Sequence, residues 1–407
     1  MQTLTCAFCA VAMISAVTAP GEEPDYKRLY EEQKARNDAL ERRMIILEQK
    51  VAAEYVPTAK VTETTLGFIG KTELSGFVSA SYTYNFNDPA GRTNTGRGFG
   101  TRANEFMLNK FVLSLEKPVE YNAFDWEAGY SAKLFFGQDA KFTQTDLSLG
   151  EAGDLFEANV TVNIPVGNGM KVTLGKYGTP LGYEASFTEE NANWSGGNQW
   201  ALIEPFTHTG LRLTYALSEL WEVELFVNNG WDRVADNNNA RSFMGHITYT
   251  PRDATTISIA GFGGPEQDDD SEHWLRGVNL YLEQKLTPRL KTALQLDYGA
   301  EAEDGTDLVA EWLAAGLWFI YEPSKKWSAA LRGDYLNDKA GWITSGTLNF
   351  PDNEGMELYS LTLTVNFKPV EPLRIAPEIR WDYSTLKDAF DGHNDQVTIG
   401  LGAAYSF

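Results

Sequence analysis

The chain has 407 residues, a hydrophobic fraction of 43% and a formal net charge of −22. This acidity disfavours nucleic acid as a partner, because binding to phosphates needs a basic surface. The long apolar run at 6–17 is too short for a transmembrane helix, which needs about 20 apolar residues. The chain holds 22 Phe, 18 Tyr and 11 Trp, and such rings suit a boundary between lipid and water. If the protein lies in a membrane, it must therefore cross it with strands.

Residues 1–19 are predicted to be a signal peptide. The apolar stretch 6–17 is followed by small residues that suit cleavage. Two features fit less well, since no Lys or Arg precedes the stretch and Pro20 follows the expected cut. Both cysteines, Cys6 and Cys9, lie in this segment, so the mature protein would contain no cysteine and need no redox control in the periplasm.

Residues 20–56 are predicted to form a periplasmic helix. Its seam residues follow alternating steps of three and four and are Tyr30, Gln33, Asn37, Leu40, Met44, Leu47 and Val51. This heptad spacing favours a short coiled coil, with Asn37 at a position that fixes register. The seam covers only about three heptads, so a single amphipathic helix lying on another surface is the alternative. Pro57 ends the helix, and residues 57–71 are interpreted as a linker.

Residues 72–407 change to a period of two and predict an all-β, transmembrane antiparallel β-barrel of about 16 strands. In 373–383, apolar and polar residues alternate, and 356–367 and 396–407 repeat the pattern. The predicted strands have roughly 10 to 14 residues, which suits tilted strands in a bilayer better than the 5 or 6 usual in soluble sheets.

Two further features favour a membrane barrel over a soluble sandwich. Short turns, such as those near Pro118 and at 165–169, alternate with longer polar loops, as expected for periplasmic turns and external loops. Aromatic residues gather at both strand ends and predict two girdles. The ring set beside the short turns comprises Trp221, Tyr249, Phe319, Tyr321, Trp327, Phe367, Tyr405 and Phe407, and the other comprises Tyr82, Tyr84, Tyr298, Tyr335, Tyr359, Trp381 and Tyr383.

The longest loop, 179–205, is predicted to fold into the lumen as a constriction. Ordered domains rarely carry a loop of this length without a use. The candidate acids on it are Glu184, Glu189 and Glu190. A loop packed on the rim or in a subunit contact is the alternative.

Charged residues that face the lumen by alternation are the candidate pore lining. Their signs are mixed, so pairing across strands would neutralise many of them. The overall acidity predicts a weak preference for cations. The candidates are Arg212, Glu222, Glu224, Lys291, Asp297, Arg332, Asp334, Arg374, Glu378, Arg380 and Asp382.

Catalytic and metal signals are weak. The sequence has no G-x-S-x-G and no H-E-x-x-H motif, and alternation places His208 and His246 in the lumen. The Asp/Asn runs 236–239 and 268–270 offer oxygen ligands for calcium, but without EF-type spacing they are interpreted as solvated loops. We therefore predict no enzyme, no metal and no cofactor.

The middle of the chain contains the runs GKYGTPLGYE at 175–184, NANWS at 191–195, EPFTHTG at 204–210, NNGWD at 228–232 and DNN at 236–238. In these runs the chain resembles a known family, the OmpL-like putative β-barrel porins. The resemblance implies an outer-membrane channel and supplies no catalytic residues.

The sequence thus predicts a porin in the bacterial outer membrane. Ions and small hydrophilic solutes would diffuse passively through its water-filled barrel, which outer-membrane lipid would surround. A homotrimer is expected. The alternative is a plugged structural barrel that anchors the outer membrane through its periplasmic helix.

Overall fold

The computed structural model describes Lys34 and residues 72–145, 149–150, 152–187, 189–252, 254–302 and 309–407. The predicted signal peptide (1–19), coiled-coil helix (20–56) and linker (57–71) lie outside these residues, except that Lys34 is helical. No helix within the described part of the chain is long and apolar enough to cross a membrane.

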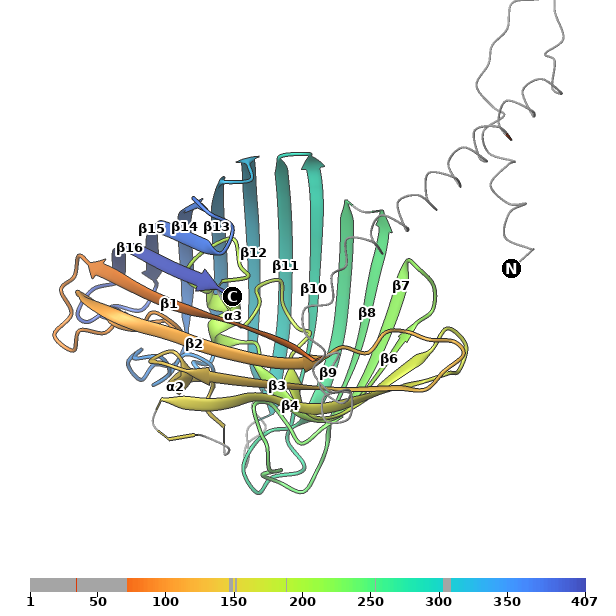
Figure 1. Cartoon of the computed structure of the whole chain (residues 1–407). Helices are drawn as coiled ribbons and strands as arrows, with labels where there is room; N and C mark the ends of the chain where they lie inside the picture. Colours follow the sequence, from red (N-terminus) through yellow and green to blue (C-terminus); the bar gives the residue numbers. More distant parts are fainter. Residues whose placement is uncertain are drawn as a thin grey trace, which may run out of the picture. The chain divides into compact units, whose positions relative to one another are not determined.

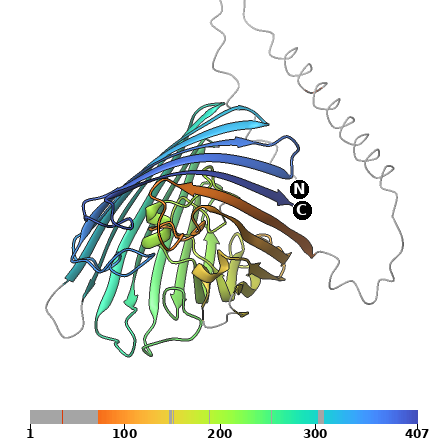
Figure 2. The ribbon, with the colours of Figure 1, turned by 90° about the vertical axis from the view of Figure 1, so that its left-hand side faces the viewer.

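Sixteen antiparallel strands form a closed barrel, which confirms the predicted fold and strand number (Figures 1 and 2). Each strand pairs with its neighbours in the sequence, and β1 closes the barrel against β16. The elements are β1 (Glu73–Asn85), β2 (Glu105–Lys117), β3 (Glu127–Phe136), α2 (Ala140–Thr143), β4 (Gly153–Ile164), β5 (Met170–Gly178), α3 (Asn198–Leu202), β6 (Thr207–Ala216), β7 (Trp221–Asn228), β8 (Ser242–Arg252), β9 (Thr255–Pro265), β10 (Trp274–Thr287), β11 (Leu290–Ala302), β12 (Val309–Ser324), β13 (Trp327–Asp338), β14 (Met356–Phe367), β15 (Leu373–Ser384) and β16 (Asp395–Ser406).

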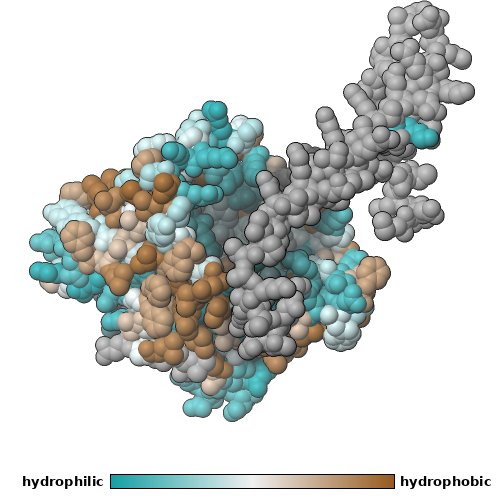
Figure 3. Space-filling view, in the orientation of Figure 1, coloured by the Kyte–Doolittle hydropathy of each residue, from teal (hydrophilic) through white to brown (hydrophobic). Residues whose placement is uncertain are grey.

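The polarity of the two faces of the barrel wall is inverted relative to a soluble protein. Successive residues of a strand point to opposite faces. Leu361 and Ile379 are 49% and 46% exposed, whereas Thr362 and Arg380, which alternate with them, are almost fully buried. Brown, hydrophobic side chains accordingly gather on the outer surface (Figure 3). An apolar outside and a polar inside are what a barrel surrounded by lipid requires.

Ring pairs lie at both ends of the apolar band. Beside the short turns, Trp327 stacks on Phe367 with the ring centroids 4.3 Å apart. At the opposite strand ends, Tyr359 lies 5.0 Å from Tyr335 and 6.1 Å from Tyr383. All these pairs lie between neighbouring strands, in the positions of the two predicted girdles.

The connections form a short-turn side and a long-loop side, as predicted. Both ends of the barrel sequence, Glu73 and Ser406, lie on the short-turn side. One connection differs from the prediction of a short turn near Pro118. The segment between β2 and β3 has nine residues, 118–126. One of its side chains, Tyr121, reaches Glu222 on β7.

Candidate functional site

The connection between β5 and β6, residues 179–206 (loop L3), lies inside the ring of strands, and its helix α3 lies against β12 and β13 (Figures 1 and 2). Its backbone donates hydrogen bonds to side chains of the inner wall. Tyr183 N lies 2.7 Å from Gln295 Oε1 on β11, and Asn198 N lies 3.0 Å from Asp334 Oδ1 on β13. The loop is thus bound to the wall from within.

Arg332 is the most connected anchor of this loop. Its side chain has no exposed surface. The guanidinium donates to Glu184 Oε1 at 2.7 Å, to the Ser195 carbonyl at 2.6 Å and to Asp334 Oδ2 at 3.0 Å. Glu184 also accepts a hydrogen bond from Gly197 N at 2.6 Å. One strand arginine therefore holds two separate parts of L3, and its charge is balanced by two carboxylates.

A second anchor lies on β15, beside the first. Arg380 donates to the Gly196 carbonyl at 2.6 Å and to Asp382 Oδ1 at 2.6 Å. Glu378 accepts from the backbone N–H of Trp194 at 2.8 Å. All three charged side chains are buried beneath the loop. Buried charges of this kind are tolerated only when they are paired and hydrogen bonded, and here the loop backbone supplies part of that pairing.

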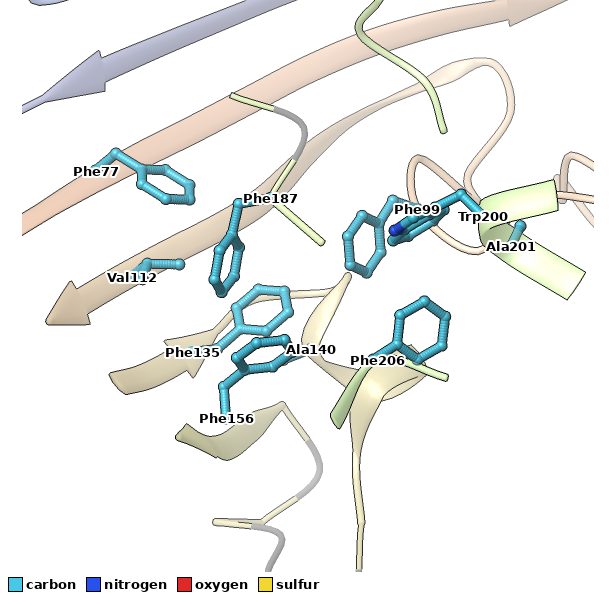
Figure 4. Close-up of a cluster of buried hydrophobic side chains, with 10 residues drawn as sticks. All are labelled: Phe77, Phe99, Val112, Phe135, Ala140, Phe156, Phe187, Trp200, Ala201 and Phe206. Carbon is cyan, nitrogen blue, oxygen red and sulfur yellow. The ribbon is translucent and has the colours of Figure 1, made fainter. Parts of the chain in front are cut away.

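Apolar packing fills the lumen on the other side of L3 (Figure 4). Phe187 lies 4.9 Å from Phe156 and 5.7 Å from Phe77, between ring centroids, and Phe99 lies 4.6 Å from Trp200. We call this group the aromatic cluster, and it comprises Phe77, Phe99, Val112, Phe135, Ala140, Phe156, Phe187, Trp200, Ala201 and Phe206. It joins L3 to the wall formed by β1–β4 and excludes water from that part of the bore.

Two polar cavities border L3. The first chamber has a volume of about 420 Å³ and follows the inner wall of β3–β7, with Glu157, Thr173 and Arg212 among its lining residues. The second chamber has a volume of about 450 Å³ and lies between L3 and β10–β15, with Glu190 and Lys291 in its lining. Solvent can therefore enter the lumen beside the loop.

Charges of both signs line the first chamber. Arg212 is 31% exposed and lies 2.6 Å from Glu224, while Lys133 lies 3.1 Å from Glu157. Part of each basic side chain stays accessible, so these pairs face water on one side.

All the lumen candidates predicted from alternation point inward, but they fall into two groups. Four line a chamber: Arg212 and Glu222 the first, Lys291 and Arg374 the second. Arg374 is also buried and donates hydrogen bonds to backbone carbonyls of L3. The others are buried in contacts with L3 or with neighbouring wall residues, and they are Glu224, Asp297, Arg332, Asp334, Glu378, Arg380 and Asp382.

The three loop acids also differ. Glu184 is buried against Arg332, and the Glu189 carboxylate lies 3.6 Å from Lys110 Nζ with its side chain only 6% exposed. Glu190 is exposed and lines the second chamber. Two of the acids therefore fix L3 in place, and one faces solvent in the lumen.

Several residues that face the lumen were not predicted from the sequence pattern. Lys133 and Glu157 face each other in register on β3 and β4, next to an irregularity that shifts the alternation. Arg97, on the loop after β1, reaches Asp382 at 3.1 Å. The opposite charges of Lys133 and Glu157 were a usable signal, whereas a loop residue such as Arg97 has no periodicity to follow.

Asp139 lies on the connection between β3 and β4, near the external rim, and its burial changes the pKa of its carboxyl. Asp139 accepts a hydrogen bond from Gly100 N at 2.9 Å and lies 3.7 Å from Lys110. Burial raises the pKa of Asp139 to about 6, against the opposing effect of Lys110. The Asp139 carboxyl is therefore about half ionised near pH 6, and this contact between the first two external loops loses its negative charge as the pH falls below that value.

Three polar side chains on β7–β9 align like an acid, a base and a nucleophile. His246 Nδ1 lies 2.7 Å from Glu224 Oε2, and its Nε2 lies 2.6 Å from Ser258 Oγ. Nucleophilic catalysis uses this order, but it also needs a hydroxyl that a substrate can reach. Ser258 has no exposed surface and lines neither chamber. The arrangement therefore acts as a hydrogen-bonded tie between three strands.

The acidic loop runs are bound to their own surroundings. Asp236 Oδ1 accepts from the backbone N–H groups of Asn238 and Asn239, each at 2.8 Å. Asp268 pairs with Arg233 at 3.1 Å. Among the described residues, no three His, Cys, Asp or Glu side chains come together in a way that could hold a metal ion.

Residues 71–407 match the family described as putative β-barrel porin-2, OmpL-like. No curated protein matches the chain. Among solved structures, the outer-membrane channel DcaP of Acinetobacter baumannii is 15% identical with a TM-score of 0.56, over 83% of this chain and 97% of that one. An anion-selective porin from Comamonas acidovorans is 11% identical with a TM-score of 0.57, over 83% and 99%. The trimer form of OmpT from Vibrio cholerae is 11% identical with a TM-score of 0.55, over 83% and 99%. At these identities the likeness shows the fold.

Proposed function

The chain belongs to the putative β-barrel porin-2, OmpL-like, family of the bacterial outer membrane, and we propose that it conducts ions and small hydrophilic solutes by passive diffusion. The observation that carries this proposal is the first chamber, a polar cavity beside L3 within a closed barrel. Its lining extends from Glu222, near the short turns, to Thr179, at the external end of β5. The proposed path requires no cofactor and no chemical step.

L3 would act as the constriction of this path. Its buried acids Glu184 and Glu189 would hold the loop, while Glu190 would contribute negative charge to the lumen. Of the strand residues, Arg212 and Glu222 would line the main path. With a formal net charge of −22, the protein would favour cations weakly.

Replacing Arg212 by glutamine is expected to increase the preference for cations. The change leaves Glu224 without its cationic partner and removes one positive charge from the first chamber. One such charge near water is worth at most about 1 kcal/mol, so the cation-to-anion permeability ratio should rise by at most about fivefold. The measurement is the reversal potential in a salt gradient. Arg289→Gln, an equal charge change on the exposed turn after β10, is the control and should leave the ratio unchanged.

Single-channel recording of the purified protein in a planar bilayer tests the proposal as a whole. We expect discrete current steps. In a salt gradient, the sign of the reversal potential should indicate a weak preference for cations. The alternative is a plugged structural barrel, and the burial of most lumen charges and rings beneath L3 favours it. Folded, heat-modifiable protein that carries no current would support that alternative.

We also propose that three barrels associate as a homotrimer. The support is the similar fold of OmpT from Vibrio cholerae, which has been solved in a trimer form. The predicted helix 20–56 is the candidate assembly element, together with the barrel wall. The mass of the detergent-solubilised protein, with and without residues 20–56, would identify the element. A monomeric mass for the full chain would contradict the proposal.

A further inference from the structure

The nine-residue segment 118–126 between β2 and β3 is the longest connection on the short-turn side among the described residues, where the others span two to five. Asn163, fully buried at the end of β4, fixes it. The Asn163 amide donates to the carbonyls of Asn122 at 2.8 Å and Asp125 at 2.9 Å. Gly169, at a φ of +96°, permits the close approach, because a Cβ there would lie 2.7 Å from Asn122 N. The segment therefore has a defined conformation against the β4–β5 turn.

From this segment, Tyr121 reaches across the short-turn end of the first chamber. Its hydroxyl donates to Glu222 Oε2 on β7 at 2.6 Å. β4, β5 and β6 separate β3 from β7 along the wall, which at a strand spacing of about 4.8 Å is a distance of about 19 Å. The backbone covers part of that distance by lying against the β4–β5 turn, where Asn163 and Gly169 contact Asn122, and the Tyr121 side chain spans the remainder to β7.

The Tyr121 ring is fixed on its face as well as at its hydroxyl. Lys171 Nζ, at the start of β5, lies 4.1 Å from the ring centroid, within the range of a cation–π interaction. Burial and the hydrogen bond to Glu222 both raise the pKa of Tyr121, so its phenol stays protonated and remains a donor at neutral pH. All three side chains line the first chamber at its short-turn end.

We propose that Tyr121 is a crossbar at the periplasmic mouth of the first chamber and sets the size limit for solutes entering from that side. Short turns face the periplasm in barrels of this kind. The charges beside the crossbar balance, since Lys117 and Lys171 are matched by Glu116 and Glu222. The crossbar should therefore select by size and leave the sign of charge to other residues. The inference rests on the proposed diffusion path.

The test is Tyr121→Ala in the full chain, recorded in planar bilayers. Polyethylene glycols of increasing size are added to one side at a time. Removal of the ring should raise conductance roughly twofold and admit larger polymers from the periplasmic side, with an unchanged limit from the external side. Tyr121→Trp should act in the opposite direction, and it keeps the inference testable if the alanine variant does not fold. Phe124→Ala, on the same segment at an 89% exposed residue, is the matched control and should change nothing.

Each outcome separates the crossbar from the channel itself. If Tyr121→Ala or Tyr121→Trp keeps the wild-type conductance and both polymer limits, the crossbar is overturned and the porin remains. If the external limit shifts as much as the periplasmic one, Tyr121 does not act at that mouth, which also overturns it. An absence of current in folded wild-type protein would overturn the proposed function.

Discussion

Replacing Arg332 by alanine is expected to lower the free energy of unfolding of the barrel by roughly 3–5 kcal/mol. The reason is that removal of the buried cation leaves its partner carboxylates buried without an opposite charge. Glu184 and Asp334 would each lose their guanidinium, and the Ser195 carbonyl would lose its donor. L3 should then detach in part from β13. In a bilayer, the variant should show noisier and larger current steps than the wild type.

Equilibrium unfolding in lipid vesicles measures the stability effect. Lys291→Ala is the control, since Lys291 pairs with Glu322 at 3.4 Å at a partly exposed site and should contribute at most about 1 kcal/mol. Adding Glu184→Gln to the Arg332 variant should cost less than the sum of the two single changes, because both act on one network. Equal stability of wild type and Arg332→Ala would show that L3 does not depend on this anchor.

The barrel was predictable because lipid leaves the chain few choices. Every backbone polar group in a bilayer must be paired, so a strand protein has to close its sheet. Strict alternation then shows which side chains face lipid. In β15, Ile379 and Trp381 point outward, while Arg380 and Asp382 point inward, as the pattern indicated.

The site was less predictable, because alternation gives the face of a residue and says nothing about what covers it. Arg332 and Arg380 satisfied the pattern for pore-lining residues, yet the carbonyls of Ser195 and Gly196 cover both. Those contacts join residues more than 130 positions apart and leave no periodic trace. The long segment after Pro118 was missed for a related reason, since a proline after a strand indicates an end of pairing and gives no length.

Replacing Phe187 by alanine is expected to cost roughly 3–5 kcal/mol of stability, as is usual for a buried phenylalanine. The Phe187 ring of L3 packs against three strands, since it contacts Phe77 on β1, Phe135 on β3 and Phe156 on β4. Lys133 Nζ lies 5.0 Å from the same ring and 3.1 Å from Glu157, which lines the first chamber. The change should therefore loosen the aromatic cluster and free a charge beside the proposed path.

Unfolding and single-channel conductance should be measured on the same preparation of this variant. Phe106→Ala is the matched control, because Phe106 is 87% exposed on the outer face and its contact with Tyr82 is worth at most about 1.5 kcal/mol. If Phe187→Ala lowers stability and raises conductance, the dry cluster forms one side of the constriction, so the width of the path depends on apolar packing as well as on lumen charges. If stability falls and the current stays the same, the cluster seals a part of the bore that ions never enter. An unchanged unfolding midpoint would contradict the assignment of Phe187 as a structural contact.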